Sequence, residues 1–273
     1  MPESPEILSY VTFLQKYLDS TILTNILHNN KQMNLHDNYK GKIININCKG
    51  KLMWLSVSTD TKNIFYYIHI HLGLKGKILT SDIDHNNIRY EFIFSNDKKI
   101  YIDDSINLAS VKILDESEHS NALNKLGIDV FSQEFTLNNF ALKFKKKKGM
   151  LAGFIMDQKN FAGMGNYIKN EILYLSNLNV KIKTNELTDE DIKNLYNNIL
   201  YVAYSKLLTN LKQINLYVED VDKNKLVNMP KNITLPYVFK VYKQKTVEGK
   251  KNSEPVIKTK ILNRDSYTIT ELL

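Results

Sequence analysis

The first residues of the chain could form a covalent bond to an aldehyde-like carbon. The sequence opens Met1-Pro2-Glu3, and an initiator methionine is commonly removed before a small residue such as proline. Pro2 would then carry a free α-amine, a group with a pKa of about 7.7–8.0, so part of it is neutral and nucleophilic. Its attack on such a carbon gives an iminium ion that promotes elimination, with Glu3 close enough to move protons. The alternative is that this segment only leads into a helix.

A second candidate is an anion site in the middle of the chain. Gly163 and Gly165 flank Met164 directly before a predicted helix that begins at Asn166. Glycines allow close approach of backbone N–H groups, and the first turn of a helix favours a phosphate through its free N–H groups and its dipole. The alternative is an ordinary tight turn with Asn166 as the helix cap.

Three cationic positions could add phosphate contacts. Lys51 follows Gly50 at the start of a predicted strand, and Lys147 belongs to a run of four lysines at 145–148. Arg264 lies in a predicted terminal hairpin of a chain with only two arginines, and its planar fork suits bidentate phosphate contact. Each is also explained as an exposed surface cation, and the lysine run as a nuclear-import signal.

Metal binding has little support in the sequence. His69 and His71 alternate on one predicted strand and share a face, but spacing identifies no third ligand, so core or surface histidines are the better interpretation. The single cysteine, Cys48, excludes an internal disulfide and a cysteine-clustered zinc site. We therefore expect no metal and no cofactor.

Composition places the chain among ordinary globular proteins. Its 273 residues are 43% hydrophobic and 24% charged, which excludes extended disorder and suits one large domain or two. The net charge of +8 favours a polyanion, nucleic acid first and an anionic membrane second. The acidic start is unlike a signal peptide, and no apolar run approaches the roughly 18 residues of a membrane span. We expect an intracellular protein without a membrane partner, in the nucleus or the cytoplasm.

The elements that would position these residues fall into two halves. Ser4 and Pro5 predict the start of a helix with a stripe of apolar residues. Short runs rich in β-branched and aromatic residues then predict an antiparallel sandwich or barrel. These runs are residues 42–47, 51–58, 64–71, 88–94 and 99–102.

After about residue 115 the periodicity becomes helical. Helices are predicted over residues 118–126, 137–146, 166–178 and 188–211, a loop over 220–235, and strands over 238–242 and 256–268 around a turn at 248–254. The predicted domains are therefore 1–115, rich in strands, and 116–273, helical, with a terminal hairpin at about 238–270.

Taken in order along the chain, these features resemble the formamidopyrimidine-DNA glycosylase / endonuclease VIII family of base-excision repair enzymes. The resemblance covers nearly the whole chain. The segments that carry it are Met1-Pro2-Glu3, Lys49-Gly50-Lys51, residues 70–74, Leu126-Gly127, Gly163-Met164-Gly165-Asn166 with Glu171, and Pro255-Val256 with residues 259–264. It implies an α+β fold: an N-terminal antiparallel β sandwich with flanking helices, then a helix-two-turn-helix domain ending in a β-hairpin finger.

The resemblance implies a bifunctional DNA glycosylase and abasic-site lyase acting on flipped-out oxidised bases. Pro2 would be the nucleophile, Glu3 would assist proton transfer, and β,δ-elimination would cut the strand. The phosphates around the lesion would be held by Lys51, Asn166 and Arg264. The other DNA-binding residues expected are Gly165, Leu74 and Lys147. The implied partner is DNA with damaged bases or abasic sites, and the implied state is a monomer.

Three departures from the family pattern refine this expectation. The finger lacks the zinc-binding cysteines often found in the family, so strand pairing and packing of Val241, Val256, Ile257 and Ile261 would hold it. The loop at 103–108 lacks the Arg and the Phe with which family members fill the space left by the flipped base. Leu74 then remains as the wedge, and we expect weaker activity on duplex DNA than on single strands or bubbles. The short loop at 218–235 favours oxidised pyrimidines and hydantoins over 8-oxoguanine.

Two alternatives stay open at this point. The chain could be a helix-two-turn-helix module that binds damaged or single-stranded nucleic acid without chemistry. The loop at 103–108, which lacks the Arg and the Phe, supports this alternative. The presence of Pro2, Glu3 and Lys51 argues against it, because a protein that only binds would not need them. A basic RNA-associated structural protein is a third reading, supported by charge alone.

Overall fold

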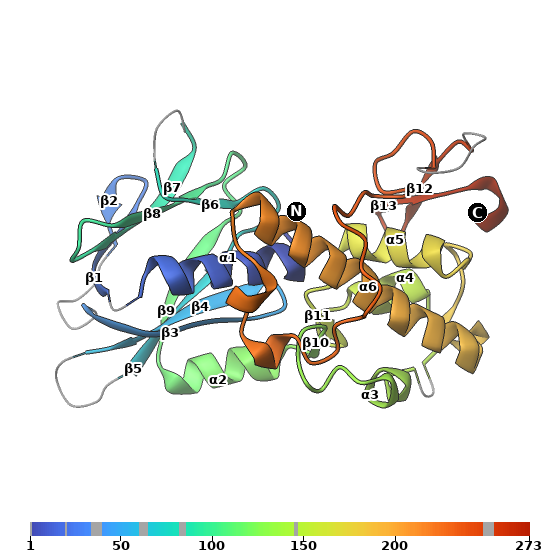
Figure 1. The fold of residues 1–273 in the computed structure, drawn as a ribbon, viewed down its shortest axis with the longest axis horizontal. Helices are drawn as coiled ribbons and strands as arrows, with labels where there is room; N and C mark the ends of the chain where they lie inside the picture. The colour runs from blue at the N-terminus through green and yellow to red at the C-terminus, as the bar shows by residue number, and fades with distance from the viewer. Residues whose placement is uncertain are drawn as a thin grey trace. The chain divides into compact units, whose positions relative to one another are not determined.

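The chain folds as two compact units, Met1–Lys125 (unit 1) and Leu126–Leu273 (unit 2). The computed structural model, drawn in Figure 1, describes residues 2–19, 21–33, 40–59, 65–81, 86–144, 147–247 and 254–273. The division between the units comes after helix α2 (Glu116–Asn124) rather than at the expected residue 115. The reason is that α2 packs on strands β5 (Phe65–His71) and β9 (Ser110–Leu114) of unit 1.

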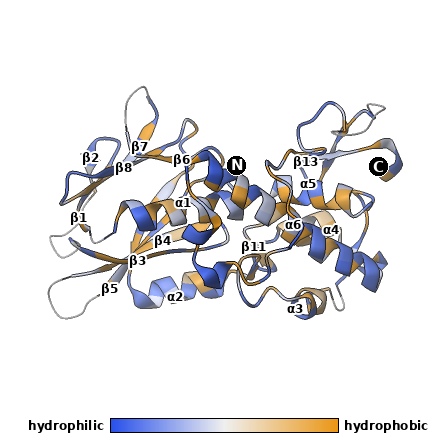
Figure 2. Cartoon of the chain, viewed as in Figure 1, coloured by the Kyte–Doolittle hydropathy of each residue, from blue (hydrophilic) through white to orange (hydrophobic). Residues whose placement is uncertain are grey.

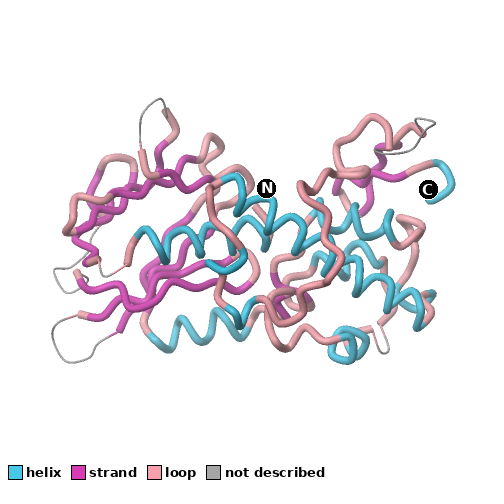
Figure 3. The backbone as a smooth tube through the Cα atoms, in the orientation of Figure 1, coloured by secondary structure: helices cyan, strands magenta, loops and turns pink. Residues whose placement is uncertain are grey.

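Unit 1 is an antiparallel β sandwich, as expected. One layer has the strand order β6-β8-β7-β1 and the other β3-β4-β5-β9, and a short pairing of β1 with β3 joins them. Figure 3 shows the two groups of strands in magenta. The remaining strands are β1 (Ile22–His28), β2 (Lys31–Gln32), β3 (Gly41–Lys49), β4 (Leu52–Ser58), β6 (Lys77–Leu79), β7 (Ile88–Phe94) and β8 (Lys99–Asp103).

All five predicted strand runs of unit 1 are strands in the structure, namely β3, β4, β5, β7 and β8. Strands β1, β2, β6 and β9 were not predicted, and β2 has only two residues. β6 has three residues, and in β1 the two positions after Leu23 are the polar Thr24 and Asn25, next to a register shift. Such short or interrupted strands carry too little alternation to be recognised in a single sequence.

Helix α1 (Ser4–Tyr17) packs against β3 and β4 and buries the predicted stripe. Ile7, Val11 and Leu14 are each at most 2% exposed. The predicted cap is wrong by one residue, because the helix cap is Glu3 and Ser4 is already helical. Proline is tolerated throughout the first helical turn, whose N–H groups have no partner inside the helix, so Pro5 does not fix the start to one residue.

Unit 2 is built around helices α5 (Asn166–Leu175) and α6 (Asp189–Gln213), which pack on each other. Thr188 caps α6, as predicted. The other elements are β10 (Ile128–Asp129), α3 (Leu137–Leu142), α4 (Leu151–Met156), β11 (Phe161–Ala162) and the 3-10 turns at Thr184–Glu186, Val218–Asp220, Lys223–Lys225 and Thr270–Leu272. Figure 2 shows the contrast between the mainly hydrophilic α2 and the more hydrophobic α4.

The core of unit 2 beside α6 is aromatic. Phe135 stacks on Tyr196 of α6 and meets Phe140 edge-on, while Phe140 contacts Phe161. These rings fix α3 and β11 against α6. In the described part of the chain, no helix is both long and apolar enough to cross a membrane.

The terminal finger differs from the prediction in its strand pairing. The predicted strand 256–268 is itself a hairpin, in which β12 (Ile257–Ile261) pairs with β13 (Arg264–Thr268). Its two-residue turn is Leu262-Asn263, both with positive φ. The predicted strand 238–242 is not a strand, and most of the predicted turn, residues 248–253, lies outside the described residues.

Candidate active site

Pro2 and Glu3 are held at the start of α1. Glu3 is 1% exposed and forms a capping box with Glu6: the Glu3 backbone N–H donates to Glu6 Oε2 at 3.0 Å, and the Glu3 side chain accepts from the first turn. Pro2, directly before this box, is half-buried. The start of a helix favours negative charge. A carboxylate is therefore fixed one residue from the proline amine, while Met1 lies outside the described residues.

Lys51 lies in the tight turn between β3 and β4. Gly50 supplies the positive φ of 61° that this turn needs. Lys49, on the other side of the turn, donates from Nζ to the Leu123 carbonyl at the end of α2, at 3.2 Å. Burial, and next the charge of Lys51, lower the pKa of His71, so the Lys51 ammonium group lies near that imidazole. In Figure 1 this turn lies toward the end of unit 1 at which α1 starts.

Leu74 lies on a loop that touches a second exposed leucine. The adjacent Gly73 has a φ of +60° and packs so tightly on Leu108 that an added Cβ would lie 2.8 Å from Leu108 atoms. Leu74 and Leu108 are 39% and 51% exposed. The loop that carries Leu108 is pinned by the fully buried Asp104, whose carboxylate accepts from the backbone N–H groups of Leu108 at 2.6 Å and Ala109 at 2.7 Å. Leu108 was not among the predicted site residues, although Asp104 followed by Ser105 and Asn107 is a sequence signal for such a loop.

His69 and His71 do not act as a pair. His69 is 6% exposed, and its Nε2 lies 2.7 Å from Nδ1 of His119 on α2. Tyr67 stacks on His119 with ring centroids 3.8 Å apart, and Trp54 meets it edge-on. His71 instead accepts from the Gly73 N–H. His69 is thus a core histidine with a protein partner.

In unit 2, the glycine segment forms the turn into α5 as expected. Gly163 has a φ of +91°, and its N–H donates to Gln158 Oε1 at 2.9 Å. The Gln158 amide nitrogen in turn donates to Met164 O at 2.8 Å. Gly165 is the helix cap and Asn166 the first helical residue, which corrects the alternative of Asn166 as cap. The N–H groups of this first turn are the ones predicted to bind phosphate, and that role stays a prediction.

The polar face of α5 holds the finger strand β13. Asn166 donates from Nδ2 to the Asp265 carbonyl at 3.0 Å, and Asn170 accepts from the Tyr267 N–H at 2.8 Å. Between them, Lys169 is 0% exposed and donates from Nζ to Ser266 Oγ at 2.8 Å. The structure thereby brings Asn166 next to exposed Arg264, which begins β13 and precedes Asp265.

Glu171, one turn further along α5, is a buried anchor. It is 0% exposed and accepts four hydrogen bonds. The donors are Tyr237 Oη and the backbone N–H groups of Lys240, Val241 and Tyr242, at 2.6–3.0 Å. These N–H groups are unavailable to a strand partner, which explains why residues 238–242 are not a strand.

Two family models match the chain: the formamidopyrimidine-DNA glycosylase N-terminal domain over residues 1–111, and the H2TH (helix-two-turn-helix) domain of the same glycosylase over residues 126–214. The chain belongs to the formamidopyrimidine-DNA glycosylase / endonuclease VIII family. Members of this family are DNA glycosylases that repair oxidised bases and have abasic-site lyase activity.

The similar proteins include both formamidopyrimidine-DNA glycosylases and endonuclease 8-like proteins. The formamidopyrimidine-DNA glycosylase of Wolbachia pipientis wMel is 27% identical over 206 residues, which are 71% of this chain and 74% of that protein. Endonuclease 8-like 3 of Bos taurus is 32% identical over 151 residues, which are 51% of this chain but 24% of that protein.

Solved structures of formamidopyrimidine-DNA glycosylases share the fold. The Lactococcus lactis enzyme, in complex with DNA containing an oxidised pyrimidine, superposes with a TM-score of 0.77 at 17% identity, over 98% of both chains. The Thermus thermophilus enzyme gives a TM-score of 0.74 at 17% identity, over 98% of this chain and 97% of that one.

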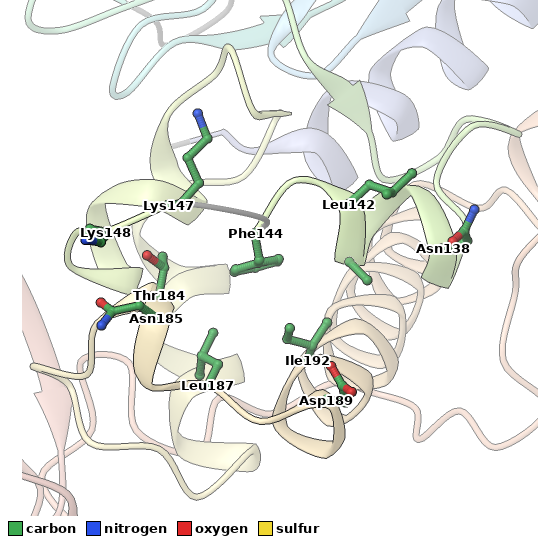
Figure 4. A pocket seen from close by; sticks show the side chains of 11 residues that line it. Asn138, Leu142, Phe144, Lys147, Lys148, Thr184, Asn185, Leu187, Asp189 and Ile192 are labelled. Atoms are coloured by element: carbon green, nitrogen blue, oxygen red, sulfur yellow. The ribbon is translucent and has the colours of Figure 1, made fainter.

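Lys147 lies apart from the contacts between α5 and β13. It lies with Lys148 at a pocket of about 390 Å³ between α3, the turn Thr184–Glu186 and the start of α6 (Figure 4). None of the residues that line this pocket belongs to the contacts between α5 and β13. Lys145 and Lys146 lie outside the described residues.

The finger of this glycosylase is held differently from the prediction. Its apolar cluster consists of Val241, Val247, Tyr267, Ile269 and Leu272, with Val256 against it. Of the four residues expected to hold the finger, Val241 and Val256 belong to this cluster and Ile257 and Ile261 do not. The pairing of β12 with β13 agrees with the expected strand pairing, and the polar contacts from α5 also hold the finger.

Proposed function

We propose that this chain excises oxidised bases with Pro2 as the nucleophile and then cuts the DNA strand at the resulting abasic site. The observation that carries the proposal is the pairing of Pro2 with buried Glu3 at a rigid helix start, in a chain of this glycosylase family. Removal of Met1 is required, because only then does the Pro2 nitrogen carry a lone pair that is free to attack.

The reaction begins when the Pro2 nitrogen forms a bond to the sugar carbon that carries the damaged base. The bond to the base breaks, the base leaves with a proton, and Glu3 assists proton transfer as the sugar ring opens. The product is an iminium ion. This ion withdraws electrons from the neighbouring C–H bond at C2′, so loss of that proton expels the 3′ phosphate. The new double bond is conjugated with the iminium ion, and loss of a second proton, from C4′, then expels the 5′ phosphate.

The proposed DNA contacts divide between the two units. Lys51 acts in unit 1, next to the catalytic amine. In unit 2, the Gly165 and Asn166 backbone at the start of α5 and the Arg264 guanidinium bind phosphates. Asn166 Nδ2 has two hydrogens, of which Asp265 O takes one. Lys147 is a further, peripheral phosphate contact. Such contacts add affinity without sequence preference, which suits damage that occurs anywhere.

For the substrate, we propose oxidised pyrimidines and hydantoins before 8-oxoguanine. The segment at 218–235 is short and packs on its own unit, since Tyr204 Oη donates to Lys225 O at 2.9 Å and Asn228 Nδ2 donates to Phe135 O at 3.0 Å. A loop held in this way has little length left to enclose a purine. A panel of lesion oligonucleotides tests this, and cleavage dominated by 8-oxoguanine opposite cytosine would refute it.

We also propose that single strands and bubbles are cleaved faster than duplex. Leu74 and Leu108, both exposed, would fill the space that a flipped base leaves in the duplex, because the loop at 103–108 has neither Arg nor Phe. Substitution Leu108→Phe should raise the duplex rate several-fold and leave the single-strand rate unchanged, whereas Leu137→Phe, on unit 2, should change neither. Wild-type rates that are equal or higher on duplex would contradict the proposal.

Borohydride trapping on an abasic-site oligonucleotide tests the chemistry itself. Reduction of the iminium ion should give a stable adduct of protein and DNA with an untagged N-terminus, and a short N-terminal extension should abolish it. The same extension placed after Leu273 serves as the control and should leave the adduct intact. If protein that lacks Met1 binds the oligonucleotide but gives no adduct, the non-catalytic DNA-binding module becomes the better reading.

A further inference from the structure

Lys169 is a fully buried lysine that the proposed chemistry does not use. It lies on α5 between Asn166 and Asn170, and its Nζ donates to Ser266 Oγ at 2.8 Å and to Asp265 O at 3.3 Å. Ser266 is itself 0% exposed. Burying a lysine head group is strongly unfavourable unless hydrogen bonds replace its water. Two of the acceptors that replace this water belong to one short piece of β13.

Asn166, Lys169 and Asn170 of α5 form hydrogen bonds to the same short segment of β13. Positions 166, 169 and 170 are spaced three and four apart, so they share one face of the helix. Asn166 and Lys169 both donate to the Asp265 carbonyl, and Asn170 accepts from the Tyr267 N–H. Together they fix the backbone of β13 from Asp265 to Tyr267, directly after Arg264.

We propose that Lys169 is a positioning residue that sets the place of Arg264 on the DNA backbone. The finger has no cysteine, and its apolar cluster holds Tyr267 but not Arg264 or Asp265. The Lys169–Ser266 bond therefore fixes the strand where the apolar cluster does not reach. Since Asn166 bonds to Asp265, the same clamp ties the two phosphate-binding residues of unit 2 into one rigid group.

This inference rests on the proposed role of Arg264, so its test separates the clamp from DNA binding. The substitutions are Lys169→Met, which keeps the length of the side chain without a donor, and Ser266→Ala, which removes only the acceptor. Lys193→Met, at an exposed site on α6, is the matched control. Circular dichroism checks the fold of each variant, and Ser266→Ala keeps the test valid if Lys169→Met does not fold.

Hydrogen exchange of the free protein tests the clamp. Amides of residues 264–268 should exchange faster in Lys169→Met and Ser266→Ala than in wild type, and at the wild-type rate in Lys193→Met. Unchanged exchange in both clamp variants would overturn the proposal. This readout requires no DNA, so it stands even if the chain does not bind damaged DNA.

DNA binding tests the positioning of Arg264. Lys169→Met should weaken binding of an abasic-site oligonucleotide about five- to tenfold, while the rate of borohydride trapping at saturating DNA stays within about twofold. In an Arg264→Ala background, Lys169→Met should have no further effect on affinity. An equal loss in both backgrounds would show that Lys169 does not act through Arg264. If the wild type itself does not bind, the proposed function fails and the exchange result is unaffected.

Discussion

At the scale of single residues, the contact between His69 and His119 cannot form when both rings are protonated. A short bond between two ring nitrogens needs one donor and one acceptor, and a protonated imidazole is only a donor. Burial, then the neighbouring His119 and Lys112, lower the pKa of His69 to about 4. Burial also lowers the pKa of His119. Burial therefore makes uptake of a proton by either ring unfavourable in the folded unit.

We expect the stability of unit 1 to fall as the pH falls from about 6.5 toward 4. In this window the unfolded chain binds a proton at His69, with its ordinary pKa of 6.5, and the folded chain does not. Acid therefore favours unfolding, by about 1–2 kcal/mol in total, and the stabilisation is fully present above pH 6.5. Urea unfolding at a series of pH values measures the loss.

The joint substitution of His69→Phe and His119→Phe should remove most of this loss, and His28→Phe should retain it. Acidic groups also titrate at the lower end of the window, so the difference between wild type and the joint variant is the quantity to compare. Parallel pH curves for these two proteins would contradict the argument.

At the scale of elements, helix α5 shows what the sequence could and could not predict. The glycines before Asn166 predicted its start correctly, because turn and cap preferences are local. The burial of Lys169 could not be predicted, since its partner Ser266 lies 97 residues further along the chain. The strand predicted at 238–242 failed for the same reason, because the carboxylate of Glu171 binds its N–H groups. Local pattern predicted the turn before α5, and distant contacts decide how the finger is held.

Gly127 links the start of unit 2 to the turn before α5. Its N–H donates to Gln158 O at 2.8 Å, and an added Cβ would lie 2.3 Å from the backbone C and O of Asn160. Backbone atoms cannot move away as a side chain can. Gly127→Ala should therefore lower the free energy of unfolding by about 2–3 kcal/mol. It should also weaken DNA binding, because the displaced segment leads into Gly163 and Gly165.

Gly149→Ala is the matched control, since an added Cβ there meets nothing within 4 Å. Its effect on stability should stay below about 0.5 kcal/mol. Denaturant midpoints of the two variants measure the contrast. Equal midpoints would mean that the segment at 158–160 shifts without cost.

At the scale of the whole molecule, the net charge belongs to one unit. Residues 1–125 contain 14 Lys and Arg against 14 Asp and Glu, whereas residues 126–273 contain 23 against 15. The entire excess of +8 therefore lies in unit 2, together with Asn166, Arg264 and Lys147. Unit 1 carries the proposed nucleophile in a neutral background. Apart from the proposed contact at Lys51, attraction to the DNA backbone is therefore expected of unit 2 and chemistry on the sugar of unit 1.

This division predicts which lysines control the salt dependence of binding. A lysine that neutralises one phosphate contributes about 0.7–0.9 to the slope of log affinity against log salt concentration. Lys147→Gln, in the basic unit, should lower that slope by about this amount and leave the trapping rate at saturating DNA unchanged. Lys42→Gln, equally exposed but on β3 of the neutral unit, should leave the slope as in wild type. Titrations of an abasic-site oligonucleotide at several salt concentrations measure both slopes. A loss of slope with Lys42→Gln that equals the loss with Lys147→Gln would show that the DNA backbone contacts unit 1 beyond Lys51, and that net charge does not locate the contacts.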